Sequence, residues 1–197
     1  LTSEPSNHDL TFKKGGERLL RRVQGYHDLR LDGIGDLLSR ARDASVFDIG
    51  CNRGMVGFEF ACNGAFRVMG CDLYEDGIIA ARHVFCDMRS VQHRFEVVDL
   101  TGGEKAIRKA FGDDEVHDHD IVLMLATYHK LQRVMSPDAL SALVRYFGSK
   151  TRRYFAWRGE EAEMDRLGRD LGAVGLRKVQ WSNLGSIDKQ HSAIWAR

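Results

Sequence analysis

The chain has 197 residues, of which 29 are basic and 28 acidic, so its formal net charge is +1. This length suits a single domain, and the balanced charge excludes a protein that coats nucleic acid through a surplus of Lys and Arg. The 20 Gly and 2 Pro are typical of a globular chain with many tight turns. The longest apolar run, Ile121–Ala126, is far shorter than the ~20 residues of a membrane helix, so we expect no membrane association.

The first 42 residues are predicted to form a helical cap or lid, and residues 43–197 are predicted to form the main domain. Apolar residues in the first part recur at helical spacing; they are Leu19, Leu20 and Val23, then Ile34, Leu37, Leu38 and Ala41. None of the four Cys forms a C-x-x-C pair, which indicates reduced, mostly buried thiols and a cytoplasmic location.

From Ser45 onward, short apolar runs alternate with segments of helical periodicity. The expected strands are 45–49, 66–72, 95–98, 120–126 and 153–157. The expected helices are 55–63, 75–87, 104–111, one that begins at 136–138, and 161–171. Five such units predict a parallel sheet with helices on both faces. Two last strands, 176–182 and 192–196, have no helix between them and must be antiparallel to each other. We therefore predict a three-layer αβα fold with a seven-stranded, mostly parallel sheet and an antiparallel last strand.

The strongest functional signal is the turn that follows the first of these strands, Gly50-Cys51-Asn52-Arg53-Gly54. Gly50 allows a tight turn and the close approach of a ligand, and Gly54 allows a helix to pack closely on the strand. Asp72 ends the next strand, 22 residues after Gly50. An acidic side chain at that place accepts hydrogen bonds from both hydroxyls of a ribose. Turn, helix and acid in this order predict a nucleoside-containing ligand.

The turn departs from the dinucleotide fingerprint G-x-G-x-x-G, whose second Gly makes room for a pyrophosphate. Asp48, two residues before Gly50, would repel a pyrophosphate but attract an ammonium group. Asp48, Gly50 and Gly54 resemble the first motif of the class I S-adenosylmethionine-dependent methyltransferases, an acidic residue followed by x-Gly-x-Gly-x-Gly. Asn52 stands where the middle Gly is usual, and we expect it to adopt a positive φ.

The resemblance covers about residues 40 to 197. It implies a Rossmann-like fold, S-adenosylmethionine as the cofactor and S-adenosylhomocysteine as the product. Asp72 matches the acid that binds the ribose, and Asp99 matches the acid that meets the adenine amino group, with Leu100 as an apolar neighbour. The alternative for Asp99 is a helix cap. The cofactor contacts implied together are Asp48, Gly50, Cys51, Asn52, Gly54, Asp72, Leu73, Asp99, Leu100 and Ala126.

Catalytic candidates follow the fourth strand, where this family places the methyl-transfer site. His129 is the best candidate base, because an imidazole with a pKa near ~6.5 accepts a proton at neutral pH. Tyr128 is predicted to close over the cofactor or to orient the substrate. The alternative is that both are loop residues that pack on the next helix. The run from His117 to Asp120 is interpreted as a solvated loop, and no metal site is predicted.

Substrate contacts are predicted at two places. Tyr26, His27 and Arg30 lie in the cap, where this family often adds a lid over the substrate. Trp157 and Arg158 end the fifth strand, at the ligand-binding edge of an open sheet. The alternatives are a surface connection between helices for the first group and packing at the rim for the second.

These features predict methyl transfer to oxygen or nitrogen of a polar small molecule. A tRNA or other RNA methyltransferase stays open, because the N-terminal stretch with Lys13, Lys14 and Arg18 is basic. A non-catalytic module that binds the cofactor is a further alternative. A nicotinamide dehydrogenase is disfavoured by Asp48 and Asn52. The sequence leaves the methyl acceptor and the oligomeric state open.

Overall fold

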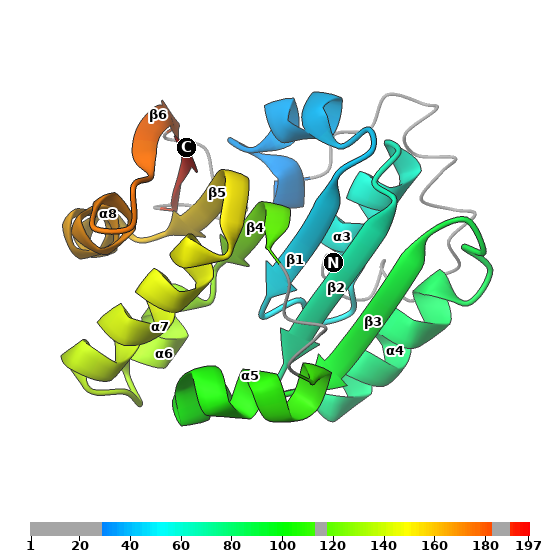
Figure 1. Ribbon diagram of the computed structural model, residues 1–197, viewed down its shortest axis with the longest axis horizontal. Helices are drawn as coiled ribbons and strands as arrows, with labels where there is room; N and C mark the ends of the chain where they lie inside the picture. Colours follow the sequence, from blue (N-terminus) through cyan, green and yellow to red (C-terminus); the bar gives the residue numbers. More distant parts are fainter. Residues whose placement is uncertain (1–28, 113–117, 183–189) are drawn as a thin grey trace, which may run out of the picture.

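A seven-stranded sheet forms the centre of the computed structural model, which describes residues 29–112, 118–182 and 190–197 (Figure 1). The strand order is β3-β2-β1-β4-β5-β7-β6. The strands are β1 (Ser45–Ile49), β2 (Arg67–Asp72), β3 (Gln92–Val97), β4 (His119–Leu125), β5 (Thr151–Gly159), β6 (Arg177–Ser182) and β7 (His191–Ala196). Strand β7 is antiparallel to its neighbours β5 and β6, and the remaining pairs are parallel. The predicted sheet is confirmed, including its antiparallel last strand.

Helices cover both faces of the sheet (Figure 1). One face carries α3 (Met55–Cys62), α4 (Glu75–Phe85) and the 3-10 turns η1 (Leu29–Leu31) and η2 (Gly35–Arg40). The other face carries α5 (Gly103–Phe111), α6 (Tyr128–Gln132), α7 (Pro137–Ser149) and α8 (Met164–Gly172). Two further 3-10 turns, η3 (Leu100–Gly102) and η4 (Glu161–Glu163), follow β3 and β5. This is the three-layer arrangement that the alternating pattern predicts.

The sheet separates two hydrophobic cores, and the alternation of side chains along each strand supplies both. In β4, Ile121 and Leu123 point into the core under α3 and α4, whereas Val122 and Met124 point into the core under α5, α7 and α8. Successive side chains of a strand point to opposite faces. A strand covered on both sides therefore has to be apolar throughout, which explains the uninterrupted apolar run of β4.

Three segments differ from the predicted elements. Strand β3 begins at Gln92 rather than Phe95, because its first residues are exposed polar residues at the edge of the sheet and give no apolar signal. Residues 35–40 form a 3-10 turn instead of a longer regular helix. His119 and Asp120 are not in a solvated loop: both belong to β4, His119 is buried, and Asp120 accepts hydrogen bonds from Ser45.

The cysteines also differ in part from expectation. None of the four forms a disulfide, but only Cys51 and Cys71 are buried, whereas Cys62 and Cys86 are exposed. Among the helices of the described residues, none combines the length and apolar character needed to cross a bilayer. The helical pattern at residues 19–23 lies outside the described residues, and the division at residue 42 stays a prediction.

Replacement of Phe47 tests the importance of the core between β1 and the helices. Its ring packs on Phe111, Phe147 and His119 at centroid distances of 5.4, 5.5 and 5.0 Å. We expect Phe47→Ala to lower the free energy of unfolding by about 3–5 kcal/mol, because it leaves a cavity that the sheet cannot close. The matched control is Phe66→Ala, whose side chain is 45% exposed and whose loss should cost less than about 1 kcal/mol. Chemical denaturation measures both variants. Equal losses of stability would contradict the conclusion that the Phe47 ring supports this core.

Candidate functional site

The turn between β1 and α3 has three left-handed residues in alternation. Gly50, Asn52 and Gly54 have φ values of 74°, 48° and 68°, so the positive φ expected for Asn52 is confirmed. At Gly50 a Cβ would overlap the Thr127 side chain, so any other residue there would force Thr127 to shift. The amides of Gly50 and Cys51 both donate to the Cys71 carbonyl, at 2.8 and 3.0 Å. The turn is therefore held against the end of β2.

Asp72 fastens this turn through its carboxylate. Its Oδ2 accepts from the Asn52 amide at 2.8 Å, and its Oδ1 accepts from the Tyr74 amide at 2.9 Å. Each carboxylate oxygen has a second lone pair, so the group retains capacity for two hydroxyls of a ligand. Leu73 is 68% exposed beside it. A carboxylate next to an exposed apolar side chain is suited to a ribose that carries a planar base.

Asp99 has the helix-cap role that the sequence analysis kept as an alternative. Its Oδ1 accepts from the amide and the hydroxyl of Thr101, at 2.9 and 2.7 Å. These two hydrogen bonds lower the pKa of the carboxyl, so Asp99 is ionised at neutral pH. Leu100 is packed into the core. The cap leaves Oδ2 of Asp99 for a second role, whereas the Leu100 side chain is largely covered.

Asp48 is a buried carboxyl whose charge is disfavoured. Burial, and then the neighbouring Asp72, raise the pKa of Asp48 to about 7, against the opposing effect of Arg158. Arg158 is itself 4% exposed, and burial lowers its pKa to about 10. Its Nη1 donates to the main-chain carbonyl of Arg30 at 2.6 Å. The fold thus brings together Asp48, Arg158 and Arg30, which lie far apart in the sequence.

The end of β4 is strained and closely tied to its neighbours. Ala126 has a φ of 55°, a left-handed conformation that costs a non-glycine residue roughly 1–2 kcal/mol. Its amide donates to the Arg158 carbonyl at 2.7 Å. The Thr127 hydroxyl is 3.1 Å from the Ile49 carbonyl and 3.2 Å from the Leu125 carbonyl. Such strain persists only where the surroundings enforce it, and it is frequent at functional sites.

His129 lies at the start of α6, immediately beyond this strained segment. Its side chain is 18% exposed, and its Nδ1 is 3.8 Å from Oε1 of Glu163. Burial, and then the positive charge of Lys130, lower the pKa of His129. The imidazole is therefore neutral at neutral pH, the form that a general base requires. Glu163 was missed by the sequence analysis, because a lone Glu in a charged segment gives no signal of burial.

Two predicted aromatic contacts are corrected by the structure. Tyr128 is 1% exposed, and its ring belongs to the core under α7 and α8 rather than to the ligand-binding edge. Trp157 is fully buried, and its indole N–H donates to Glu163 at 3.1 Å. Both rings belong to the core under α7 and α8, so neither presents a surface to a ligand. Tyr26 and His27 lie outside the described residues.

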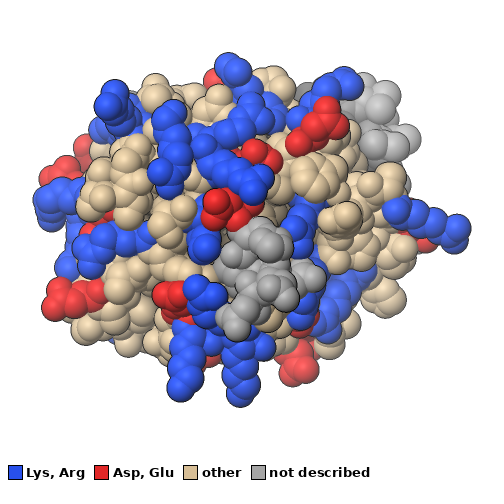
Figure 2. Space-filling model, viewed as in Figure 1, with Lys and Arg blue, Asp and Glu red and all other residues tan. Residues whose placement is uncertain are grey.

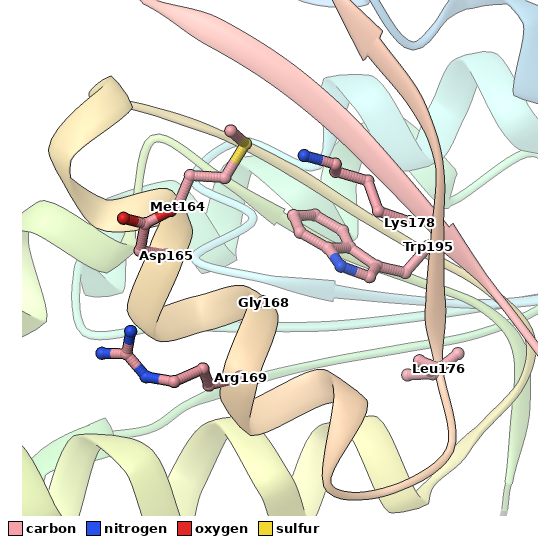
Figure 3. Close-up of a pocket in the computed structure, with 7 residues that line it drawn as sticks. All are labelled: Met164, Asp165, Gly168, Arg169, Leu176, Lys178 and Trp195. Carbon is pink, nitrogen blue, oxygen red and sulfur yellow. The ribbon is translucent and has the colours of Figure 1, made fainter.

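Two pockets in the described part of the chain lie away from these residues. One, of about 320 Å³, is formed between α8 and strands β6 and β7 (Figure 3). It is lined by Met164, Asp165, Gly168, Arg169, Leu176, Lys178 and Trp195. The other, of about 540 Å³, is bordered by η2 and by β5, β6 and β7. No predicted site residue lines either one. The residues described above lie instead at the carboxyl ends of β1, β2, β4 and β5, and this edge is the candidate site.

Solved structures share this fold. Magnesium protoporphyrin IX methyltransferase from Synechocystis PCC 6803, crystallised with bound S-adenosylmethionine, is 16% identical and aligns over 100% of both chains with a TM-score of 0.61. A TehB-like S-adenosylmethionine-dependent methyltransferase from Corynebacterium glutamicum is 16% identical over 96% of this chain and 99% of that one, with a TM-score of 0.60. The N-methyltransferase NodS from Bradyrhizobium japonicum is 13% identical over 93% and 98% of the two chains, with a TM-score of 0.60.

Comparison of the sequence with family models and with curated proteins gives no match. At these identities the structural likeness concerns the fold alone. The chain has the Rossmann-like fold of the S-adenosylmethionine-dependent methyltransferases.

The buried carboxyl of Asp48 predicts a pH-dependent stability. Its pKa rises from 3.8 to about 7 on folding, so between these values the folded state holds a proton that the unfolded state has lost. The free energy of unfolding should therefore fall as the pH rises from 4 to 7. Asp48→Asn, which mimics the protonated form, should stabilise the chain at pH 8 by up to about 4 kcal/mol.

Denaturation at a series of pH values measures this effect. Asp87→Asn is the control, because Asp87 is exposed and its loss should leave the pH dependence as it is in the parent chain. A variant Asp48→Asn that is no more stable than the parent at pH 8 would show that the Asp48 carboxyl is not held in an unfavourable environment.

Proposed function

We propose that this protein is an S-adenosylmethionine-dependent methyltransferase that acts on a polar small molecule. The observation that carries the proposal is the Asp72 carboxylate, hydrogen-bonded to the turn after β1 on a sheet with the methyltransferase strand order. In this fold, ligands bind where the strand order reverses. Here the reversal lies between β1 and β4, and Asp48, Gly50 and Ala126 flank it.

The side chains at this edge fit the proposed cofactor in chemistry and in place. Asp72 would accept hydrogen bonds from the ribose hydroxyls, and the exposed Leu73 would pack on the adenine. Oδ2 of Asp99 would accept from the adenine amino group. Asn52 has a buried Oδ1 without a hydrogen-bond partner, which suits a donor from a ligand. Asp48 would face the ammonium group of the methionine moiety, and that charge would favour its ionised form.

The cofactor, when bound, supplies a methyl group on a positively charged sulfur. The chain then has to hold the acceptor in line with that methyl group, exclude water and take up the proton that the acceptor loses. His129 would perform the last of these tasks; its position after β4 at the same edge and its neutral imidazole support this role. Arg158 and Arg30, which lie together on the other side of the edge, would form part of the substrate or cofactor contacts.

A small-molecule acceptor is supported by the charge distribution. Figure 2 shows Lys and Arg side chains interspersed with Asp and Glu over the face in view. A continuous basic surface, as RNA binding requires, is not the pattern of that face. The magnesium protoporphyrin IX methyltransferase with the same fold also acts on a small molecule. The basic stretch that favours RNA in the sequence lies outside the described residues.

Binding of the product tests the cofactor assignment. We expect S-adenosylhomocysteine to bind at micromolar concentration and Asp72→Asn to weaken it by about 10- to 100-fold, because an acceptor for a ribose hydroxyl is lost. Asp87→Asn is the matched control, since it removes an exposed carboxylate beyond the end of α4. Isothermal titration calorimetry measures all three proteins. Binding of NADH in place of S-adenosylhomocysteine would refute the proposal.

Transfer of the methyl group tests catalysis and the role of His129. Tritium from labelled S-adenosylmethionine should enter a small-molecule fraction of a cell extract. His129→Gln should reduce the rate by about 10²- to 10⁴-fold, as is typical for the loss of a general base, and leave the affinity for S-adenosylhomocysteine unchanged. Undiminished transfer in His129→Gln would refute its role as a base. Tight binding without transfer to any fraction would identify a non-catalytic cofactor-binding module.

A further inference from the structure

Two buried polar atoms without hydrogen-bond partners face each other beside the candidate site. One is Nδ1 of His129 and the other is Oε1 of Glu163, and they are 3.8 Å apart. A buried polar group without a hydrogen-bond partner is destabilising, so two of them side by side require a common explanation. Groups in catalytic sites are often slightly too far apart for a hydrogen bond until a ligand is bound.

The carboxyl of Glu163 is held in place from behind. Its Oε2 accepts a hydrogen bond of 3.1 Å from the buried indole N–H of Trp157. Glu163 is 3% exposed, although it lies in a turn between exposed acidic residues. Gly159 makes this position possible, since a Cβ there would overlap the Glu163 carboxyl and come within 2.7 Å of the Trp157 ring. Trp157 and Gly159 therefore fix Oε2 and leave Oε1 directed at His129.

Burial disfavours the charged form of both side chains of the pair. Burial raises the pKa of Glu163 to about 7 and lowers the pKa of His129. The other charged groups that act on His129 are Lys130 and Arg133 of α6, which disfavour its protonation, and Glu160, which favours it. In the core, burial raises the pKa of Tyr128, and the charge of Glu163 adds to this effect. An opposite charge on either side chain would therefore stabilise the charged form of the other.

We propose that Glu163 is the positioning residue for His129: its Oε1 accepts the Nδ1–H of the imidazole and leaves Nε2 to receive the proton of the methyl acceptor. The proton moves from the acceptor heteroatom to Nε2, and the positive charge that forms on the imidazolium lies beside the Glu163 carboxylate. A carboxylate that orients a histidine in this way fixes its tautomer and stabilises its charged form. The purpose assigned to the pair rests on the proposed function, whereas the pairing itself rests on the geometry.

Titration of the histidine side chains by NMR tests the pairing without any substrate. In the parent chain, above pH 7, the ¹⁵N resonances of His129 should show the tautomer with hydrogen on Nδ1, and the titration should respond to the ionisation of Glu163. Glu163→Gln retains the size of the side chain and an acceptor for Trp157. It should move the midpoint of His129 down by about one pH unit, because a negative charge within reach favours the imidazolium, and it should remove the second inflection.

Glu160→Gln is the matched control, because Glu160 is an exposed carboxylate that also acts on His129. It should lower the midpoint only slightly and preserve both the tautomer and the second inflection. If Glu163→Gln behaves like Glu160→Gln, the pairing is refuted. If Glu163→Gln does not fold, the reciprocal experiment applies: in His129→Gln the carboxyl of Glu163 should titrate in a single step at higher pH, and an unchanged titration would refute the pairing.

The outcome is separable from that of the proposed function. Loss of the second inflection of the His129 titration in Glu163→Gln, while S-adenosylhomocysteine does not bind the parent chain, is one distinct result. It would support the pairing and refute the methyltransferase. Binding of S-adenosylhomocysteine without coupling between the two side chains would retain the methyltransferase and refute the pair.

Discussion

The candidate site depends on one group, the carboxylate at the end of β2. Asp72 accepts the amides of Asn52 and Tyr74, so a single side chain closes the turn after β1 and begins the turn after β2. The left-handed backbone at Asn52 is unfavourable by itself, and a charge-assisted hydrogen bond offsets part of that cost. The acid proposed to bind the ribose is thereby oriented by the turn that faces the same ligand, and such preorganisation lowers the cost of binding.

Successive side chains of a strand point to opposite faces of the sheet, so the polar side chains at this edge are divided between the two faces. Asp48 points to the same face of the sheet as Val46, and Arg158 points to the same face as Ala156. This face is covered by α3 and η1. Trp157 points to the opposite face, like Phe155, and donates its hydrogen bond to Glu163 there. Charged groups suited to the cofactor and the acid–base pair suited to the acceptor thus lie on opposite sides of the same strand ends. A methyl group transferred between them would cross the edge at Ala126.

The sequence predicted the parts of this arrangement that depend on local patterns. The seven-stranded, mostly parallel sheet, the positive φ of Asn52 and the place of Asp72 follow from apolar runs, glycines and spacing. The orientation of side chains at strand ends was not predictable in the same way. Tyr128 and Trp157 were expected at the ligand-binding edge, but register and helix packing turned both rings into the core. Glu163 was missed, since only the tertiary contact with Trp157 distinguishes it from the exposed acids beside it.

The distribution of unfavourable features is an argument for function at this edge. A chain selected only to fold would gain stability by replacing buried ionisable groups with apolar residues, yet Asp48 and Arg158 are both buried. Ala126 adds backbone strain, and His129 and Glu163 add unsatisfied polar atoms. The middle of β4, a few residues earlier, is apolar and regular. These destabilising features are concentrated at the ends of β1, β4 and β5, which indicates that they serve a function there. Binding of a charged ligand is the function that would relieve them.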